Sequence, residues 1–380
     1  MSEDVSKIWI SAGEASGDLH GALLAEALRA RNPGLSLAGM GGPAMVGAKV
    51  DVRFSMRQLS LVGGTEILSS LPRILKLLRD TRKTFEEFRP QAVVVIDSPD
   101  FHFHVVRRAR ALGIPVYYYV SPQVWAWRSG RVNFLHKNVR KVLCILPFEQ
   151  AFYRERGMEA DYVGHPLLDQ IPLADLDRLE PEPGRIGILP GSRRKEVEGL
   201  LPEFSGAARL LAENQPGLRF SLVRAPGIDP ELLLRHWPQD LPITLVEPED
   251  RYRAMRQSQF VLAASGTVSL ETALVGTPTI IAYKLSPLSY FLARRLIKVK
   301  YIGLPNLILD RKVFPELIQE EARAAVMAAI GRMWLANDTS LPSIRTDLAR
   351  LRHLVGEPGA AGRAAGLILD DLAALGAGRG

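Results

Sequence analysis

The chain has 380 residues, enough for two domains of ordinary size. With 47% hydrophobic and 23% charged residues it has the composition of a globular protein with a substantial core, which excludes a disordered chain. The formal net charge of +7 favours an anionic partner, such as an anionic bilayer surface or a phosphorylated substrate, although solubility alone could also explain it. We expect no nucleic-acid partner, because no zinc spacing, RNA-binding signature or arginine-rich tract is present.

The amino terminus and the cysteine content suggest a compartment. The apolar residues 8–10 follow the start closely, with no basic region and apolar core of a secretory signal, so the expected location is the cytoplasm. The single cysteine, Cys144, lies in the apolar run 142–146 and is expected in a buried strand. No disulfide or metal framework can be built from it.

The first half of the chain alternates short apolar runs with helical segments, the pattern of a parallel doubly wound sheet. Strands are predicted at 7–11, 35–38, 92–96, 116–120 and 141–146. Helices are predicted from the loop 13–18 to about residue 31 and at 66–88, 103–112 and 130–137.

A second series follows residues 171–184, which are rich in Pro, Asp and Glu and are predicted to be a linker. We therefore predict an α/β protein with two Rossmann-like doubly wound parallel-sheet domains, residues 1–170 and 185–341, and a helical tail, 342–380. The two domains are expected to face a cleft at the carboxyl ends of their strands, where such sheets bind ligands. Within the second domain, strands are predicted at 185–189, 219–223, 243–246, 260–263 and 279–282, and helices at 196–212, 231–237 and up to Gly276.

Two acidic residues follow strands of the first domain. Asp97 closes the apolar strand 92–96 and is a candidate general base, unless it only forms the turn before Ser98-Pro99. Glu14, in the loop after the first strand, is a second acid–base candidate, unless it only rigidifies that loop. The sequence does not decide between them as the base, and Asp100 better suits a turn or cap.

An aromatic segment covers the end of the predicted strand 116–120 and the loop after it. Tyr117-Tyr118-Tyr119 end the strand, and two tryptophans flank the loop after it. Amphipathic aromatic loops suit a sugar ring or an acyl chain, while core packing is the alternative for at least one tryptophan. The candidates for facing the acceptor or its lipid are Asp100, Trp125, Trp127 and Arg128. Among the scattered histidines, His165 is expected to be nearest a ligand.

Residues 67–88 combine apolar side chains with interspersed Arg and Lys. A basic amphipathic segment of this kind can lie on an anionic membrane, but it can equally be a crossover helix with a solvated basic face. The segment 290–300 has the same two interpretations.

The loop 189–196 opens a helix after the first strand of the second domain. Gly191 allows close backbone approach to a ligand, Ser192 can cap the helix, and Arg193 offers a fork to phosphate. An ordinary capped helix is the alternative. Three consecutive basic residues at a helix amino terminus oppose its dipole, however, and so favour a bound anion.

Residues 260–283 have the apolar character of a membrane span, but two polar glycine turns interrupt them. They are better interpreted as strand, turn, short helix and strand. The turn, Ser265-Gly266-Thr267, opens a helix whose free N–H groups suit a phosphate. Glu271 lies one helical turn further and suits ribose hydroxyls. This is the pattern of a sugar-nucleotide site.

No Asp-x-Asp pair accompanies these loops in a form that would hold a divalent metal; residues 97–100 and 247–250 are the nearest approximations. We therefore predict no metal and no cofactor. Helix dipoles and arginine would stabilise the leaving diphosphate instead.

Taken together, seven motifs resemble the lipid-A-disaccharide synthase family, in the family's order from about residue 8 to about 320. The resemblance implies a two-domain GT-B glycosyltransferase at the cytoplasmic face of the inner membrane of Gram-negative bacteria. Such enzymes join UDP-2,3-diacylglucosamine to 2,3-diacylglucosamine 1-phosphate, with inversion, giving UDP and a β-1,6-linked disaccharide phosphate. The motifs are residues 11–18, 97–101, 120–128, 146–149, 164–166, 189–193 and 304–307.

The resemblance also implies roles for individual residues. Asp97 matches the family's proposed catalytic aspartate, and Glu14 its glutamate in the first glycine loop. The positions that match contacts to UDP or lie near its site are Arg193, Ser265, Gly266, Thr267, Glu271 and Asn306. Two departures, His102 where the family often has Asn and the segment 62–66, put fine acceptor contacts in doubt. Because both substrates carry acyl chains, the membrane interpretation of 67–88 gains support.

Other functions remain open at this point. An isomerase resembling UDP-N-acetylglucosamine 2-epimerase would share the nucleotide half of the fold without a lipid-facing surface, and a sugar-nucleotide sensor would bind UDP without turnover. A dehydrogenase is disfavoured, because no GxGxxG follows a strand with an acid about 20 residues on. The Ala/Gly-rich tail could pack on a neighbouring chain to form a homodimer.

Overall fold

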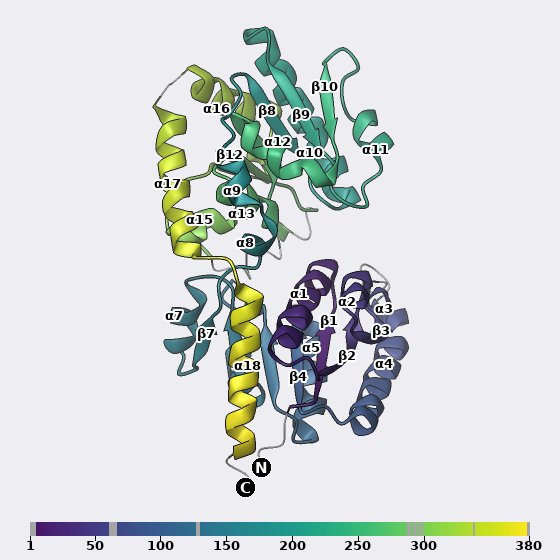
Figure 1. Cartoon of the computed structure of the whole chain (residues 1–380). Coiled ribbons are helices and arrows are strands. Elements are labelled where there is room, and N and C mark those ends of the chain that lie inside the picture. The colour runs from purple at the N-terminus through teal and green to yellow at the C-terminus, as the bar shows by residue number, and fades with distance from the viewer. Residues whose placement is uncertain are drawn as a thin grey trace. The chain divides into compact units, whose positions relative to one another are not determined.

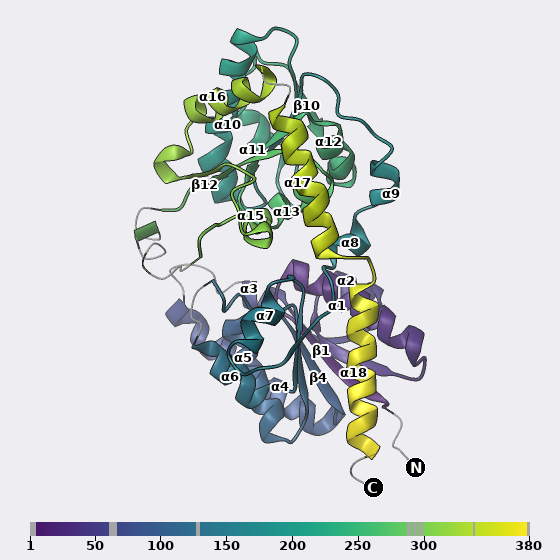
Figure 2. The same ribbon diagram turned by 90° about the vertical axis from the view of Figure 1, so that its left-hand side faces the viewer.

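A computed structural model describes residues 5–60, 67–126, 130–286, 290, 291, 295, 299–336 and 339–377, shown from two sides in Figures 1 and 2. The chain divides into two compact units. The first comprises residues 1–166 and 357–380, and the second comprises residues 167–356.

The first unit contains a seven-stranded parallel sheet in the order β3-β2-β1-β4-β5-β6-β7. The chain runs outward from β1 to β3, then crosses to the other side of β1 and continues to β7. This is a doubly wound sheet whose strand order reverses between β1 and β4. The strands are β1 (Lys7–Ala12), β2 (Ser36–Gly41), β3 (Asp51–Ser55), β4 (Ala92–Ile96), β5 (Val116–Tyr119), β6 (Lys141–Cys144) and β7 (Ala160–Tyr162).

Helices cover both faces of this sheet, so its central strands are apolar on both sides. Alternate residues point to opposite faces: Trp9 of β1 and Tyr118 of β5 join the core beneath α4, α5 and α6, whereas Tyr117 faces α18. The helices are α1 (Ala15–Arg31), α2 (Pro43–Gly47), α3 (Arg57–Ser60), α4 (Ile67–Phe88), α5 (Pro99–Ala111), α6 (Arg131–Asn138), α7 (Glu149–Arg154) and α18 (Ala360–Ala377).

The carboxyl-terminal helix α18 lies beside α1 in the first unit (Figure 2). Its small residues Ala360, Ala364 and Ala365 are buried there. Asp371 accepts hydrogen bonds from Tyr117 Oη at 2.7 Å and Arg140 Nε at 3.0 Å. The Ala/Gly-rich face that could have packed on a neighbouring chain therefore packs on its own unit, and a homodimer stays a prediction.

The second unit contains a six-stranded parallel sheet in the order β10-β9-β8-β11-β12-β13, whose strand order reverses between β8 and β11. Its strands are β8 (Arg185–Leu189), β9 (Arg219–Val223), β10 (Ile243–Val246), β11 (Phe260–Ala264), β12 (Thr279–Tyr283) and β13 (Glu316–Ile318). Its helices are α8 (Leu167–Gln170), α9 (Leu173–Leu176), α10 (Arg194–Asn214), α11 (Pro230–Arg235), α12 (Arg251–Gln257), α13 (Thr267–Leu274), α15 (Leu304–Leu309), α16 (Ala324–Ala336) and α17 (Ser340–Val355).

The predicted α/β class with two doubly wound parallel sheets is confirmed. The strand, turn, helix and strand expected in 260–283 are β11, α13 and β12. In the described part of the chain, no helix is long and apolar enough to cross a bilayer. The short edge strands β3, β7 and β13 were not predicted, because three to five residues carry too little periodicity to be distinguished from loops.

Residues 171–184, the predicted linker, belong to the second unit and are held on it by arginine. Arg256 of α12 donates from Nε to the carbonyl oxygens of Leu176 at 3.2 Å and Leu179 at 2.9 Å. Asp177 forms an ion pair with Arg352 of α17 at 2.8 Å. The two units therefore divide before this segment, between residues 166 and 167, and again within the predicted tail, between α17 and α18.

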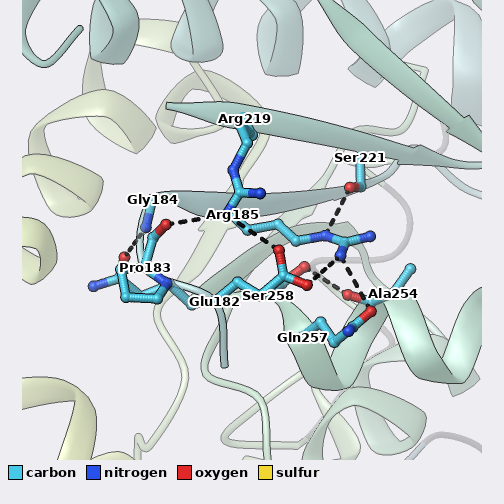
Figure 3. Close-up of polar contacts among 10 residues, drawn as sticks. Glu182, Pro183, Gly184, Arg185, Arg219, Ser221, Ala254, Gln257 and Ser258 are labelled. Atoms are coloured by element: carbon cyan, nitrogen blue, oxygen red, sulfur yellow. Dashed lines mark hydrogen bonds and ion pairs between the residues drawn. The ribbon is translucent and has the colours of Figure 1, made fainter. Parts of the chain in front are cut away.

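The end of this segment is anchored to the start of β8. The Glu182 carboxylate accepts from Arg185 at 2.9 Å and pairs with Arg219 at 3.1 Å (Figure 3). Arg185 also donates to Gln257 at 3.1 Å and to Ser221 at 3.1 Å. Acidic residues that resemble a solvated linker in the sequence are thus partners of arginines on the sheet.

Candidate functional site

Most of the predicted catalytic and UDP-binding residues lie at the two points where strand order reverses, one in each sheet. In the first unit, Glu14 follows β1 and Asp97 follows β4, and these strands are paired in register at Ala12 and Ile96. In the second unit, the loops 190–193 and 265–267 follow β8 and β11, which are also neighbours. Crevices at such reversals are the usual ligand positions of doubly wound sheets.

The turn after β4 has an unusual backbone. Asp97 and Ser98 have φ angles of 52° and 44°, so two consecutive residues with side chains occupy the left-handed region. Each such residue costs on the order of 1 kcal/mol, and strain of this kind clusters at functional sites. The turn also approaches the first loop closely: a Cβ at Gly13 would lie 2.4 Å from Ser98 Oγ. Only glycine fits at that position.

The pKa of the Asp97 carboxyl is raised toward neutral pH. Burial raises its pKa to about 6, the negative charge of Glu14 adds to this effect, and the Ser98 N–H opposes it. Glu14 itself is exposed, at the start of α1. A carboxylate with this pKa can accept a proton from a hydroxyl at neutral pH.

His102, the departure from the family pattern, lies beneath this turn. It is completely buried, with Nδ1 2.7 Å from the carbonyl oxygen of Asp97 and Nε2 3.0 Å from Ser11 Oγ. Burial lowers its pKa to about 4, so the ring is neutral at pH 7. The side chain is enclosed by the protein and contacts the main chain of Asp97, the candidate base, while the effect of this departure on acceptor contacts stays a prediction.

The described aromatic residues of β5 and of the loop after it mainly contact other parts of the protein. Tyr117, Tyr118 and Tyr119 are fully buried in the sheet, so they do not form a surface for a sugar ring. Trp125 donates from Nε1 to Glu149 Oε1 at 3.0 Å, and its ring meets Phe148 edge-on. Trp127 and Arg128 lie outside the described residues, and their predicted acceptor contacts stay predictions.

Glu149 is a buried carboxyl that the sequence did not single out as functional. It accepts hydrogen bonds from the N–H groups of Ile145 and Leu146 as well as from Trp125. Burial raises its pKa to about 7, and these three donors oppose the effect. Its contacts hold the loop that carries Trp125 against the end of β6.

Three other polar residues of the predicted motifs have different surroundings, and the predicted ligand contacts of Asp100 and His165 stay predictions. Asp100 lies in the first turn of α5, which begins at Pro99 and not at Phe103 as predicted, and pairs with Arg131 at 2.5 Å. Asp18 is buried and accepts from the N–H groups of residues 42, 44 and 45, at the start of α2. His165 is 4% exposed, and burial lowers its pKa to about 3.

The loop after β8 brings backbone N–H groups and a guanidinium together. Gly191 has a φ of 115°, and the N–H groups of Ser192 and Arg193 both point at Glu196 Oε2, at 3.2 and 3.3 Å. Arg193, not Ser192, occupies the N-cap position of α10, and Glu196 accepts from its N–H group there. Its side chain is 78% exposed and pairs with Glu196 at 3.0 Å. The predicted anion position is thus held by the protein's own carboxylate.

The loop after β11 opens α13 through Gly266, whose φ of 147° is accessible to glycine. Gly266 and Thr267 are exposed. The Ser269 N–H donates to the Gly266 carbonyl oxygen at 3.1 Å, so the N–H groups before it are the ones left without an intrahelical acceptor. One turn on, Glu271 accepts from Tyr252 Oη at 2.9 Å. Burial raises the pKa of Glu271, and that hydrogen bond opposes the shift. Arg251 in turn donates to Tyr252 Oη at 2.8 Å.

Asn306 differs from the other predicted UDP contacts. It is fully buried in α15, where its amide nitrogen donates to Phe314 O and Glu316 Oε1, and its oxygen accepts from the N–H groups of Val313 and Phe314. These four bonds use the whole capacity of the amide. The geometry therefore favours a structural role, in which Asn306 holds the loop before β13.

Several residues that shape the site were missed in the sequence, namely Ser11, Tyr118, Glu196, Arg251 and Tyr252. Glu196 lies three residues after Arg193 and accepts from its N–H group, which is one half of a capping box and a signal that the sequence offered; the guanidinium, which only donates, cannot form the other half. The others act across elements distant in sequence, and no local pattern marks them. Among the described residues, no group of three or more His, Cys, Asp and Glu side chains is arranged to hold a metal ion.

Comparison with protein families gives a match along almost the whole chain. The family model for lipid-A-disaccharide synthetase matches residues 8–365. A lipid-A-disaccharide synthase of Myxococcus xanthus is 38% identical over 373 residues, covering 96% of this chain and 97% of the relative. A second, from Syntrophus aciditrophicus, is 40% identical over 375 residues, covering 95% and 97%.

Solved structures with little sequence similarity share the fold. MurG of Acinetobacter baumannii matches with a TM-score of 0.60 at 15% identity, covering 96% of this chain and 99% of that one. A UDP-GlcNAc 2-epimerase from Neisseria meningitidis, bound to UDP-GlcNAc, matches with a TM-score of 0.63 at 12% identity, covering 96% and 99%. At these identities the likeness establishes the GT-B architecture alone, and it does not distinguish a transferase from an epimerase.

Proposed function

Because this chain belongs to the lipid-A-disaccharide synthase family, and is a glycosyltransferase of lipid A biosynthesis, we propose that it uses UDP-2,3-diacylglucosamine as donor and 2,3-diacylglucosamine 1-phosphate as acceptor. The 6-hydroxyl of the acceptor attacks the anomeric carbon of the donor, and the bond from that carbon to the diphosphate breaks. The products are UDP and a β-1,6-linked disaccharide phosphate, with inversion at the anomeric carbon.

Asp97 is the general base of this proposal. The single observation that carries the assignment is a carboxyl with a pKa of about 6, on a strained turn where strand order reverses. It removes the proton of the attacking hydroxyl as the new bond forms. General-base catalysis of this kind contributes about 10²–10⁴-fold to a rate.

Glu14 has a different role in this proposal, although the sequence left it as an equal candidate. It is exposed, whereas Asp97 is partly buried, and its charge helps to keep the Asp97 pKa near 6. A group that raises the pKa of the base makes it a stronger proton acceptor at neutral pH. We assign Glu14 to tuning the base and contacting the acceptor.

The second unit binds the nucleotide. The first-turn N–H groups of α13, after Ser265 and Gly266, suit one phosphate of UDP, and the exposed Arg193 guanidinium suits the other. Glu271, oriented by Tyr252, accepts from the ribose hydroxyls. These donors stabilise the negative charge that develops on the leaving diphosphate.

Substrates with acyl chains require a lipid-facing surface. Part of the apolar stripe of α4 packs into the core, since Leu77 and Leu78 are buried, but Leu75 is half exposed beside the exposed Arg73 and Lys76. This mixture suits peripheral contact with an anionic membrane at the cytoplasmic face of the inner membrane. The first turn of α4 and most of 290–300 lie outside the described side chains.

The test is release of UDP from UDP-2,3-diacylglucosamine in detergent micelles, with and without 2,3-diacylglucosamine 1-phosphate. We expect release that depends on the acceptor, together with a disaccharide phosphate product. A folded, UDP-binding protein that releases no UDP with the acceptor would contradict the proposal. Turnover of soluble UDP-N-acetylglucosamine without an acceptor would point to the epimerase instead.

A further inference from the structure

Side chains from two elements of the first unit, β5 and α5, converge on one backbone atom, the carbonyl oxygen of Asp97. Tyr118 Oη, from β5, lies 2.7 Å from this oxygen, and His102 Nδ1, from α5, lies at the same distance. On its other side, the His102 ring reaches Ser11 Oγ of β1 at 3.0 Å. Two donors on one carbonyl oxygen satisfy both of its lone pairs.

The chemistry of these partners fixes the proton positions. A carbonyl oxygen only accepts, so the ring proton lies on Nδ1 and Nε2 accepts from the Ser11 hydroxyl. His102 is neutral and fully buried, and Tyr118, whose pKa burial raises well above its usual value, keeps its proton. Both side chains therefore act as fixed donors throughout the physiological pH range.

We propose that His102 and Tyr118 are positioning residues that hold the Asp97 main chain in its left-handed conformation and thereby orient its carboxylate toward the acceptor hydroxyl. The inference rests on the proposed role of Asp97 as the base. The turn needs such support, because Asp97 and Ser98 both have φ angles that residues with side chains rarely adopt. Neither positioning residue contacts the substrate itself.

Removal of one donor should misplace the base without altering nucleotide binding. For Tyr118→Phe, which deletes a single oxygen, and for His102→Phe, which keeps a flat ring, we expect kcat to fall roughly 10- to 100-fold, since small misplacements of a catalytic group have effects of this size. The acceptor KM and the UDP dissociation constant should stay within about twofold, because binding groups remain in place. His102→Asn keeps an N–H donor near the Nδ1 position and should restore kcat to within about fivefold of the parent.

A matched control is Tyr117→Phe. It removes a buried hydroxyl from the adjacent residue of the same strand, but that hydroxyl binds Asp371 on the opposite face of the sheet. If loss of any buried tyrosine hydroxyl slowed the enzyme through general destabilisation, Tyr117→Phe and Tyr118→Phe would reduce kcat equally. The inference predicts a loss for Tyr118→Phe alone.

The same substitutions in an Asp97→Asn background test whether the effect on kcat passes through the Asp97 carboxylate. If Tyr118 acts through the Asp97 carboxylate, Tyr118→Phe should leave the residual turnover of Asp97→Asn unchanged. A kcat within twofold of the parent for both Tyr118→Phe and His102→Phe, with Asp97→Asn inactive, would overturn the positioning role. Full turnover by Asp97→Asn would instead overturn the proposed base. Should His102→Phe fail to fold, Tyr118→Phe carries the test.

Discussion

The two points of strand reversal are similar in topology but opposite in chemistry. In the first unit, the loop after β1 presents the carboxyl group of Glu14, and the loop after β4 presents that of Asp97. Asp97 and Ser98, both with side chains, adopt left-handed conformations in the second of these loops. In the second unit, the loops after β8 and β11 use Gly191 and Gly266 for their positive φ angles. The loop after β11 presents N–H groups at the start of α13, and Arg193, paired with Glu196, supplies a cation.

The difference follows from what each ligand requires. A base must be held in one orientation, which here requires a strained backbone turn. Its pKa must also be raised, and burial of the carboxyl raises it by desolvation. A diphosphate needs several donors at close range, which glycine turns and helix amino termini supply without strain. In our proposal, the same sheet reversal thus supports catalysis in one unit and binding in the other.

The largest effect expected from this division is on turnover. Asp97→Asn should reduce kcat by about 10³-fold, within the range for loss of a general base. Steady-state UDP release, with Glu14→Gln measured beside it, checks the prediction. Glu14→Gln should lose less activity, since it only tunes the base. A larger loss in Glu14→Gln than in Asp97→Asn would exchange the two assignments.

The pH dependence of the first unit should follow the Asp97 pKa. Protonation abolishes its ability to accept a proton, so kcat/KM should fall about tenfold per pH unit below pH 6 and level off above it. Glu14→Gln removes a charge that raises this pKa and should shift the acidic limb to lower pH. The profile of each enzyme in the same mixed-buffer series provides the measurement. An acidic limb that Glu14→Gln leaves in place would contradict the coupling.

The second unit should respond to Arg193 through nucleotide affinity. Arg193→Ala removes a charged donor, so the UDP dissociation constant should rise about 10- to 100-fold. Arg194→Ala is the matched control: it lies at the next position but pairs with Glu198 at 2.8 Å, and its effect should stay under about threefold. Isothermal titration of UDP measures both. Equal losses in the two variants would indicate a general effect of positive charge.

Replacing Asp97 should lower turnover but raise the stability of the folded protein. Because its folded pKa lies above the ordinary aspartate value of 3.8, this group's contribution to stability is lost as pH rises through about 6. Asparagine carries no charge and tolerates the left-handed conformation, so Asp97→Asn should be more stable at pH 8 by roughly 1–3 kcal/mol, with the gain vanishing near pH 4. Denaturant unfolding at the two pH values tests this, with Asp100→Asn as the exposed control. An unchanged or lower stability at pH 8 would count against the raised pKa.

The smallest effect is expected at Tyr252, which orients Glu271. Tyr252→Phe removes one hydrogen bond, so the UDP dissociation constant should rise about two- to fivefold. The loss should disappear for 2′,3′-dideoxy-UDP, which has no ribose hydroxyls for Glu271 to bind. An equal loss for both nucleotides would show that Tyr252 acts elsewhere.

Local patterns predicted much of this architecture. The apolar run 92–96 and the acid that follows it located Asp97 at the end of β4, and glycine turns located the loops after β8 and β11. The hydrophobic periodicity of strands and that of helices are enough to identify the alternating elements of such a fold. The motifs were therefore placed on the correct edges of both sheets.

What the sequence did not predict depends on contacts between distant elements. The left-handed turn at Asp97 depends on donors from α5 and β5, and the burial of His102 depends on α5 beginning at Pro99. Asn306 resembles a ligand contact in the motif, yet its amide is used entirely by the loop before β13. The acidic segment 171–184 resembles a linker until its arginine partners are known.

The central claim, that one unit holds the base and the other holds the nucleotide, is tested most directly by titrating UDP into the parent, Asp97→Asn and Arg193→Ala while turnover is measured on the same preparations. The account predicts that Asp97→Asn binds UDP like the parent although its turnover has collapsed, and that Arg193→Ala binds UDP weakly. A loss of UDP affinity in Asp97→Asn that matches its loss of turnover would contradict this division of labour.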